Sequence, residues 1–179
     1  MKNIYFIGFM GTGKTTVSKM IAERLNKKWV DLDEIIQEKE GRTIVDIFRD
    51  SGEEYFRSIE KEVLKEIADS GNFIVSTGGG IVIVDENVDI MKKSGILVTL
   101  VASPEVIYER LKDDHDRPLL QVPNPMDEIK RLMFERAPFY IKGDIIIDTS
   151  FDKPEKIVED ILLELEKLEK VNGNGKGQG

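Results

Sequence analysis

Residues 4–25 read IYFIGFMGTGKTTVSKMIAERL, and this stretch decides the fold. Its apolar start, Ile4–Ile7, has the length and composition of a buried strand. The next residues, Gly8–Thr15, fit the pattern G-x-x-x-x-G-K-[ST] at every fixed position, and Thr16–Leu25 carries apolar residues at helical spacing. Strand, glycine loop and helix in this order predict backbone N–H groups and a helix N-terminus that together hold a polyphosphate.

Two side chains complete this predicted nucleotide site. Lys14 is placed to reach the β- and γ-phosphates, and the hydroxyl of Thr15 is placed to ligate magnesium. The alternative is a glycine turn with an incidental lysine, but the flanking strand and helix argue against it.

Composition excludes several classes of protein. The 179 residues carry a net charge of −8, whereas a general nucleic-acid binder would present a basic surface. No run approaches the ~18 apolar residues of a membrane span, and the N-terminus enters a strand without a signal peptide. The lack of cysteine excludes disulfides and thiolate metal sites. We therefore expect one soluble, cytoplasmic, monomeric domain with neither nucleic acid nor a membrane as partner.

Four more apolar runs predict further strands, at residues 29–32, 73–75, 96–101 and 144–147. Helical patterns lie between these runs, and two of the helices have recognisable starts, at Ser103–Glu105 and Lys153–Pro154. Strands and helices that alternate in this way predict an α/β fold with a parallel sheet.

Two stretches interrupt the alternation. Residues 112–125 read KDDHDRPLLQVPNP, which is polar and too long for an ordinary connection, so the loop is either functional or disordered. In a phosphate-binding enzyme a lid is a natural interpretation. Residues 171–179 read VNGNGKGQG, which predicts a flexible tail or a linker because glycine-rich chain cannot form a core.

The phosphate loop alone does not define the reaction, so the acidic residues near it matter. A GTPase would need N-K-x-D, and the nearest match, residues 26–29, lacks the aspartate. The strand FIVST ends in Ser76-Thr77 instead of an acid, which leaves Asp31 and Asp33 in WVDLDEII. In an extended strand these two carboxylates project to the same side, one suited to a metal and one to a hydroxyl donor. The alternative is a solvated loop in which Asp33 caps the following helix.

Three glycines and two arginines suggest an anionic acceptor. Gly78–Gly80 offers backbone N–H groups to an anion, or else forms a flexible turn. Arg57 lies in a helical segment with Glu60 three residues further on, and Arg136 lies at a helix end set by Pro138. A guanidinium holds a carboxylate through paired N–H bonds, although a single arginine is more often a surface ion pair.

Together these segments resemble the shikimate kinase family over nearly the whole chain, to about Pro154. The resemblance rests, in order, on GFMGTGKTT, DLD, GRTIVDIF, GEEYFRSIE, STGGG, DRPLL and ERAPFY. It implies ATP-dependent phosphorylation of the 3-hydroxyl of shikimate, which gives shikimate 3-phosphate and ADP in aromatic amino-acid biosynthesis. It also implies an adenylate-kinase-like P-loop NTPase fold, a three-layer α/β/α domain around a central five-stranded parallel sheet. In that fold we expect one domain over residues 1–170, a substrate-binding segment near 33–61 and a lid near 112–124.

The resemblance also implies roles for individual residues. ATP would be bound by Gly11, Thr12, Gly13, Lys14, Thr15, Thr16, Arg110, Arg117 and Pro154, with Arg110 and Pro154 beside adenine. Shikimate would be bound by Asp33, Arg57, Gly79, Gly80 and Arg136. Mg²⁺ would be held by Thr15 and, through water, by Asp31. The catalytic residues would be Lys14, Asp33 and Arg117, with Arg117 brought in by the lid.

Two other functions fit part of the pattern. One is a P-loop kinase for another small acceptor, similar to gluconate or nucleoside monophosphate kinases, which would not need the combination of Asp33, Arg57, three glycines and Arg136. The other is a non-catalytic nucleotide-binding switch. The presence of Lys14, Thr15, Asp33 and Arg117 argues against the switch, because a silent relative would be free to lose them.

Overall fold

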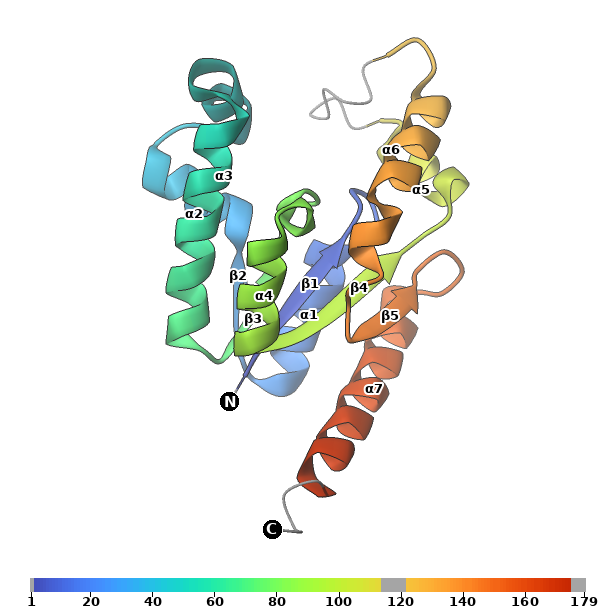
Figure 1. Cartoon of the computed structure of the whole chain (residues 1–179). Helices are drawn as coiled ribbons and strands as arrows, with labels where there is room; N and C mark the ends of the chain where they lie inside the picture. Colours follow the sequence, from blue (N-terminus) through green and yellow to red (C-terminus); the bar gives the residue numbers. More distant parts are fainter. Residues whose placement is uncertain (1, 114–121, 175–179) are drawn as a thin grey trace.

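The computed structural model describes residues 2–113 and 122–174. Its five strands form one parallel sheet in the order β2-β3-β1-β4-β5 (Figure 1). The strands are β1 (Asn3–Gly8), β2 (Lys28–Asp31), β3 (Phe73–Ser76), β4 (Gly95–Val101) and β5 (Ile145–Asp148). The helices are α1 (Lys14–Leu25), α2 (Leu32–Glu40), α3 (Ile44–Ser70), α4 (Asp85–Ser94), α5 (Pro104–Leu111), α6 (Pro125–Tyr140) and α7 (Pro154–Asn174), with a 3₁₀ turn η1 (Ile81–Ile83).

Alternation along the central strand β1 creates two separate cores. Every residue of β1 is buried, because helices cover both faces of the sheet. Ile4 and Phe6 pack on one face with residues of α1 and α7, whereas Tyr5 and Ile7 pack on the other with residues of α2 to α6. The predicted three-layer α/β/α arrangement with a five-stranded parallel sheet is confirmed.

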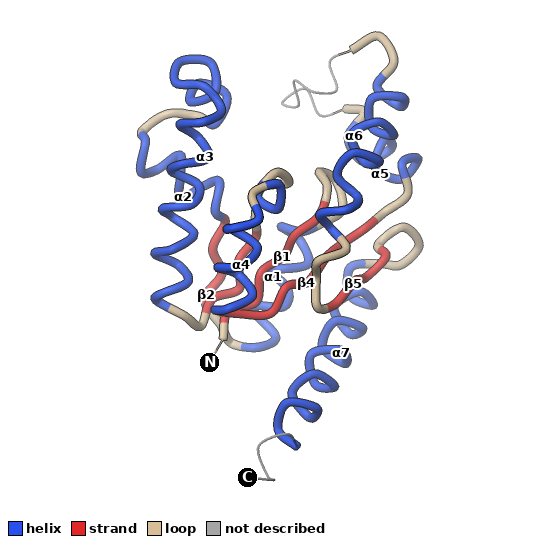
Figure 2. The backbone as a smooth tube through the Cα atoms, viewed as in Figure 1, coloured by secondary structure: helices blue, strands red, loops and turns tan. Residues whose placement is uncertain are grey.

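The carboxyl ends of the strands define the functional end of the molecule. The loop after β1, the start of α2 after β2 and the loop after β3 all lie there, because parallel strands end at the same edge (Figure 2). Helices α3 and α6 stand on opposite sides of this edge (Figure 1). No helix of the described ranges is long and apolar enough to cross a membrane.

Two helices differ in detail from the sequence predictions, and a third is interrupted. Helix α6 continues through Pro138 to Tyr140, although proline was expected to end it. Helix α7 includes residues 171–174, so helix occupies the first part of the predicted tail; residues 175–179 lie outside the described ranges. Helix α3 is interrupted at Gly52, whose φ of 83° is strained for any residue with a side chain.

Candidate active site

The phosphate loop joins β1 to α1 and leaves the start of α1 without a side-chain cap. Gly13 is the residue before the helix and has a φ of 92°, a left-handed conformation that favours glycine. Since no side chain caps α1, its first N–H groups are available to an anion, as the motif predicted.

The lysine of the motif contacts the phosphate loop, and the threonine contacts the end of strand β3. The Nζ of Lys14 donates hydrogen bonds to the carbonyl oxygens of Gly8 (2.9 Å) and Phe9 (3.0 Å), so the ammonium lies across the loop. The hydroxyl of Thr15 lies 3.4 Å from that of Ser76, at the end of β3. Strand β3 therefore contributes a hydroxyl where many P-loop proteins place an acid.

A cavity of about 300 Å³ joins the phosphate loop to part of the predicted acceptor site; Arg57, Gly80 and Arg136 do not line it. Its lining includes Gly11, Gly13, Lys14, Thr15, Thr16, Asp31, Asp33, Ser76, Gly78 and Gly79. Such a volume is at the lower limit of ordinary small-molecule sites, and its polar lining suits charged ligands.

Asp31 and Asp33 both line this cavity, but they are not placed there by a shared strand face, as was predicted. Strand β2 ends at Asp31, and Leu32 is already helical, so the two residues do not share a strand face. Asp31 is the N-cap of α2: its Oδ1 accepts hydrogen bonds from the N–H groups of Asp33 (3.0 Å) and Glu34 (3.3 Å). The alternative in which Asp33 caps the helix is therefore wrong, and its carboxylate is not used for capping.

Each of the glycines Gly78–Gly80 faces a different predicted acceptor residue. A Cβ added to the first would lie 2.9 Å from a carboxylate oxygen of Asp33. A Cβ on the second would lie 3.7 Å from Nη1 of Arg136, and one on the third would lie 2.5 Å from Nη2 of Arg57. The loop after β3 thus brings together three side chains from α2, α3 and α6, because glycine leaves room for all of them.

Arg57 is held by a carboxylate buried beneath it. Nη1 of Arg57 lies 2.7 Å from Oε2 of Glu60, whose side chain is 1% exposed. The other oxygen of Glu60 has no hydrogen-bond partner among the described residues. Burial raises the pKa of Glu60, and the positive charge of Arg57 only partly opposes this shift.

The raised pKa predicts that Glu60 makes stability depend on pH. The folded protein holds this proton more tightly than the unfolded chain, so Glu60 destabilises the fold increasingly as pH rises above its ordinary pKa of 4.5. The free energy of unfolding of wild type, minus that of Glu60→Gln, should fall as pH rises from 4.5, by at most about 1.4 kcal/mol per pH unit. Urea unfolding across pH 4.5–7 measures both terms, and Glu54→Gln, an exposed position on the same helix, is the control. A difference that rises with pH, or that matches the control, would contradict this account.

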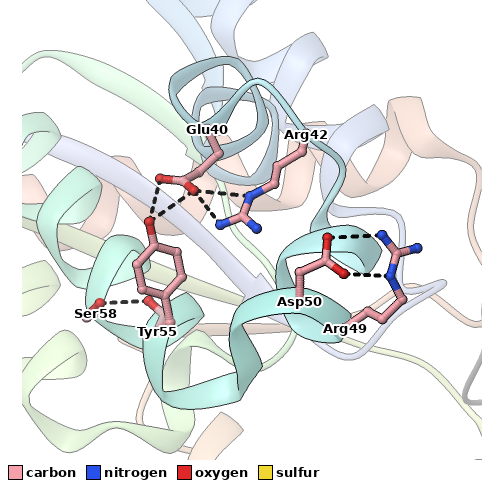
Figure 3. A network of polar contacts seen from close by, with 6 residues as sticks. All are labelled: Glu40, Arg42, Arg49, Asp50, Tyr55 and Ser58. Carbon is pink, nitrogen blue, oxygen red and sulfur yellow. Dashed lines mark hydrogen bonds and ion pairs between the residues drawn. The ribbon is translucent and has the colours of Figure 1, made fainter.

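A polar network supports the turn between α2 and α3, within the predicted substrate-binding segment (Figure 3). The hydroxyl of Tyr55 donates to both carboxylate oxygens of Glu40 at 3.2 Å, and Nη2 of Arg42 donates to the same carboxylate at 2.9 Å. Arg49 pairs with Asp50 nearby. The Tyr55–Glu40 bonds connect the end of α2 to the part of α3 that follows Gly52 and carries Arg57, whereas the Arg49–Asp50 pair lies within α3 before Gly52.

Arg136 lies between the glycine loop and the phosphate loop. Its guanidinium carbon lies 5.7 Å from the ring centroid of Phe9, which belongs to the phosphate loop. Four residues later on the same face of α6, the hydroxyl of Tyr140 donates to the carbonyl oxygen of Gly79 at 2.7 Å. The sequence reasoning missed Tyr140, because it ended the helix at Pro138.

Arg110 connects the phosphate loop to the segment before α7. Its Nη1 donates to the carbonyl oxygen of Gly11 (3.0 Å), and its Nη2 to that of Thr149 (2.6 Å). The hydroxyl of Thr149 in turn donates to the carbonyl oxygen of Thr12 at 2.9 Å. The predicted adenine residues Arg110 and Pro154 thus belong to neighbouring segments, with Pro154 as the first residue of α7. Thr149 is a further residue of this region that sequence reasoning missed, since a lone threonine after a strand gives no signal.

Arg117 lies outside the described residues, as does most of the predicted lid. Its assignment to catalysis therefore stays a prediction.

Sequence comparisons with known proteins agree on one family. The shikimate kinase family model matches residues 10–166. A shikimate kinase of Thermodesulfovibrio yellowstonii is 48% identical over 176 residues, which are 98% of this chain and 99% of that protein. Shikimate kinase from Acinetobacter baumannii, solved in complex with shikimate, has a TM-score of 0.85 at 35% identity and covers 99% of this chain and 96% of its own. Shikimate kinase from Aquifex aeolicus has a TM-score of 0.80 at 43% identity, over 98% of this chain and 99% of its own.

Proposed function

Because the chain belongs to the shikimate kinase family, we propose that it transfers the γ-phosphoryl group of ATP to the 3-hydroxyl of shikimate. The observation that carries this proposal is the glycine loop after β3, which gathers Asp33, Arg57 and Arg136 beside the phosphate loop. Two guanidinium groups suit the carboxylate of shikimate, and one carboxylate suits a hydroxyl that must attack.

The residues at the acceptor site would have two roles, which are to bind shikimate and to activate its 3-hydroxyl. Arg57 and Arg136, with the backbone of Gly79 and Gly80, would hold the carboxylate and ring hydroxyls. Asp33 would accept a hydrogen bond from the 3-hydroxyl and orient it in line with the γ-phosphate. In phosphoryl transfer most of the catalytic effect comes from such positioning and from charge stabilisation.

The phosphate loop supplies that charge stabilisation. When ATP binds, the ammonium of Lys14 would exchange its hydrogen bonds to the loop carbonyl oxygens for contacts with the β- and γ-phosphates. There it would neutralise part of their negative charge. Arg117 would add a second positive charge from the lid segment near 112–124. Arg110 and Pro154 would flank adenine.

Magnesium fits the oxygen groups near Thr15. The hydroxyl of Thr15 lies beside that of Ser76, and Asp31 is paired in register with Ser76 across the sheet. Mg²⁺ prefers oxygen ligands and keeps several waters, so one hydroxyl with a carboxylate acting through water is a suitable set. When bound, the ion neutralises charge on the β- and γ-phosphates.

We propose that this protein acts as a monomer in the cytoplasm and binds neither nucleic acid nor membranes.

A coupled ADP-release assay over a panel of acceptors tests the activity. ADP release should be strong with shikimate and weak with gluconate, with AMP or without acceptor, because only shikimate offers a carboxylate and a ring hydroxyl at the right separation. Release that is equal without acceptor would identify a plain ATPase. Preference for gluconate or AMP would identify a different small-molecule kinase.

A further inference from the structure

Tyr140 links the core of the sheet to the glycine loop. Its backbone carbonyl oxygen accepts a hydrogen bond from the hydroxyl of Thr99, a fully buried residue of β4, at 2.8 Å. At its other end, the side-chain hydroxyl donates to the carbonyl oxygen of Gly79 at 2.7 Å. Tyr140 is 6% exposed; its bond to Thr99 is buried and its bond to Gly79 is partly buried, and together they fix its position.

The bond to Gly79 determines the direction of the next N–H group. The carbonyl of Gly79 and the N–H of Gly80 belong to one planar trans peptide, so they point in opposite directions. With the carbonyl held toward Tyr140, the N–H of Gly80 must point away from it. Within residues 2–113 and 122–174 no protein atom accepts a hydrogen bond from this N–H, which leaves it available to an acceptor molecule.

The same hydroxyl is adjacent to the guanidinium of Arg136. A Cβ added to Gly79 would lie 3.6 Å from the Tyr140 hydroxyl and 3.7 Å from Nη1 of Arg136, so the two groups share one face of this residue. Burial raises the pKa of Tyr140, while the charge of Arg136 and a hydrogen bond from its side chain lower it. The net rise keeps the hydroxyl protonated at neutral pH, as its donation to Gly79 requires.

We infer that Tyr140 is a positioning residue for the acceptor, which orients the Gly79–Gly80 peptide and the Arg136 guanidinium together. The inference rests on the proposed assignment of Gly80 and Arg136 to shikimate. Without the hydroxyl, the glycine peptide is free to rotate, since glycine imposes little restriction on the backbone. A rotated peptide would turn the Gly80 N–H away from the acceptor while the nucleotide site stays intact.

Tyr140→Phe tests the inference because it removes only the hydroxyl. We expect the shikimate KM to rise about 5- to 30-fold, with kcat changed less than about threefold and the ATP KM within about twofold. The matched control is Tyr5→Phe. Tyr5 is fully buried and its hydroxyl also has two partners, Asn3 and Ser94, but it lies at the opposite end of the sheet. This control should lower the melting temperature and leave both KM values unchanged.

The possible outcomes distinguish a failure of this inference from a failure of the proposed site assignment. If Tyr140→Phe lowers only the melting temperature, as the Tyr5 control does, while Arg136→Lys still raises the shikimate KM, then Tyr140 is structural and the inference is wrong. If Arg136→Lys fails to affect shikimate, the site assignment itself is at fault. A double variant that is less impaired than the product of the two single effects would support joint positioning.

Discussion

Asp33→Asn should lower kcat about 100-fold, because the attacking hydroxyl loses its basic partner. Asparagine keeps the shape of the side chain but loses the charge and basicity that a hydroxyl nucleophile needs. General-base help contributes typically 10²–10⁴-fold, and the loose transition state of phosphoryl transfer places this case at the lower end.

The structure removes the main competing explanation for such a loss. Asp31, and not Asp33, caps α2, so Asp33→Asn should leave the free energy of unfolding nearly unchanged. ATP binding should survive, since Lys14 and Thr15 are untouched. Steady-state kinetics, urea unfolding and nucleotide titration measure the three quantities. Glu34→Gln is the control, because it removes a neighbouring exposed charge from the same helix. An Asp33→Asn protein with near-normal kcat would falsify the catalytic role.

Arg136→Lys should reduce kcat/KM for shikimate roughly 30- to 200-fold, which corresponds to about 2–3 kcal/mol. An ammonium cannot make the paired N–H bonds of a guanidinium, and it cannot stack as a plane near the Phe9 ring. The shikimate KM should carry most of the change, and the ATP KM should stay within about twofold.

Arg131→Lys provides the matched control on the same helix. Arg131 is exposed and pairs with Glu128 and Glu135, so its replacement should leave both KM values unchanged. If Arg136→Lys changed only the ATP KM, the assignment of Arg136 to shikimate would be wrong.

Local sequence patterns were sufficient for the α/β class with a parallel sheet, for the positions of the strands and for the phosphate loop, whereas the adenylate-kinase-like architecture was implied by the family resemblance. All five strands lie where apolar runs predicted them. The inner strands β3, β1 and β4 are mostly buried, and buried parallel strands need continuous apolar sequence. The loop was predictable because its glycines and lysine are adjacent in the chain. The position of the acceptor residues was not, since Asp33, Arg57 and Arg136 come from three different helices and only the family resemblance connected them.

Two features were mispredicted or missed because tertiary structure overrode a local rule. An extended chain through Asp33 was expected from strand spacing, but the Asp31 side chain caps a helix there first. Tyr140 lies four residues after Arg136, which is helical spacing, yet Pro138 suggested that the helix had already ended. Proline removes one N–H and does not prevent packing from continuing a helix around it.

The separation of the two cores by the sheet has a consequence for the divergence of such sequences. Helix α7 packs against α1 and β5, on the face of the sheet that Asp33, Arg57 and Arg136 do not use. We therefore expect substitutions among its buried residues Ile157, Val158 and Ile161 to change stability without changing the acceptor site. Substitutions in the opposite core, which holds Phe9, Ile81 and Tyr140, should change stability and acceptor geometry together. We expect members of the family to differ more in the buried residues of α7 than in those of α6, which an alignment of their sequences would test.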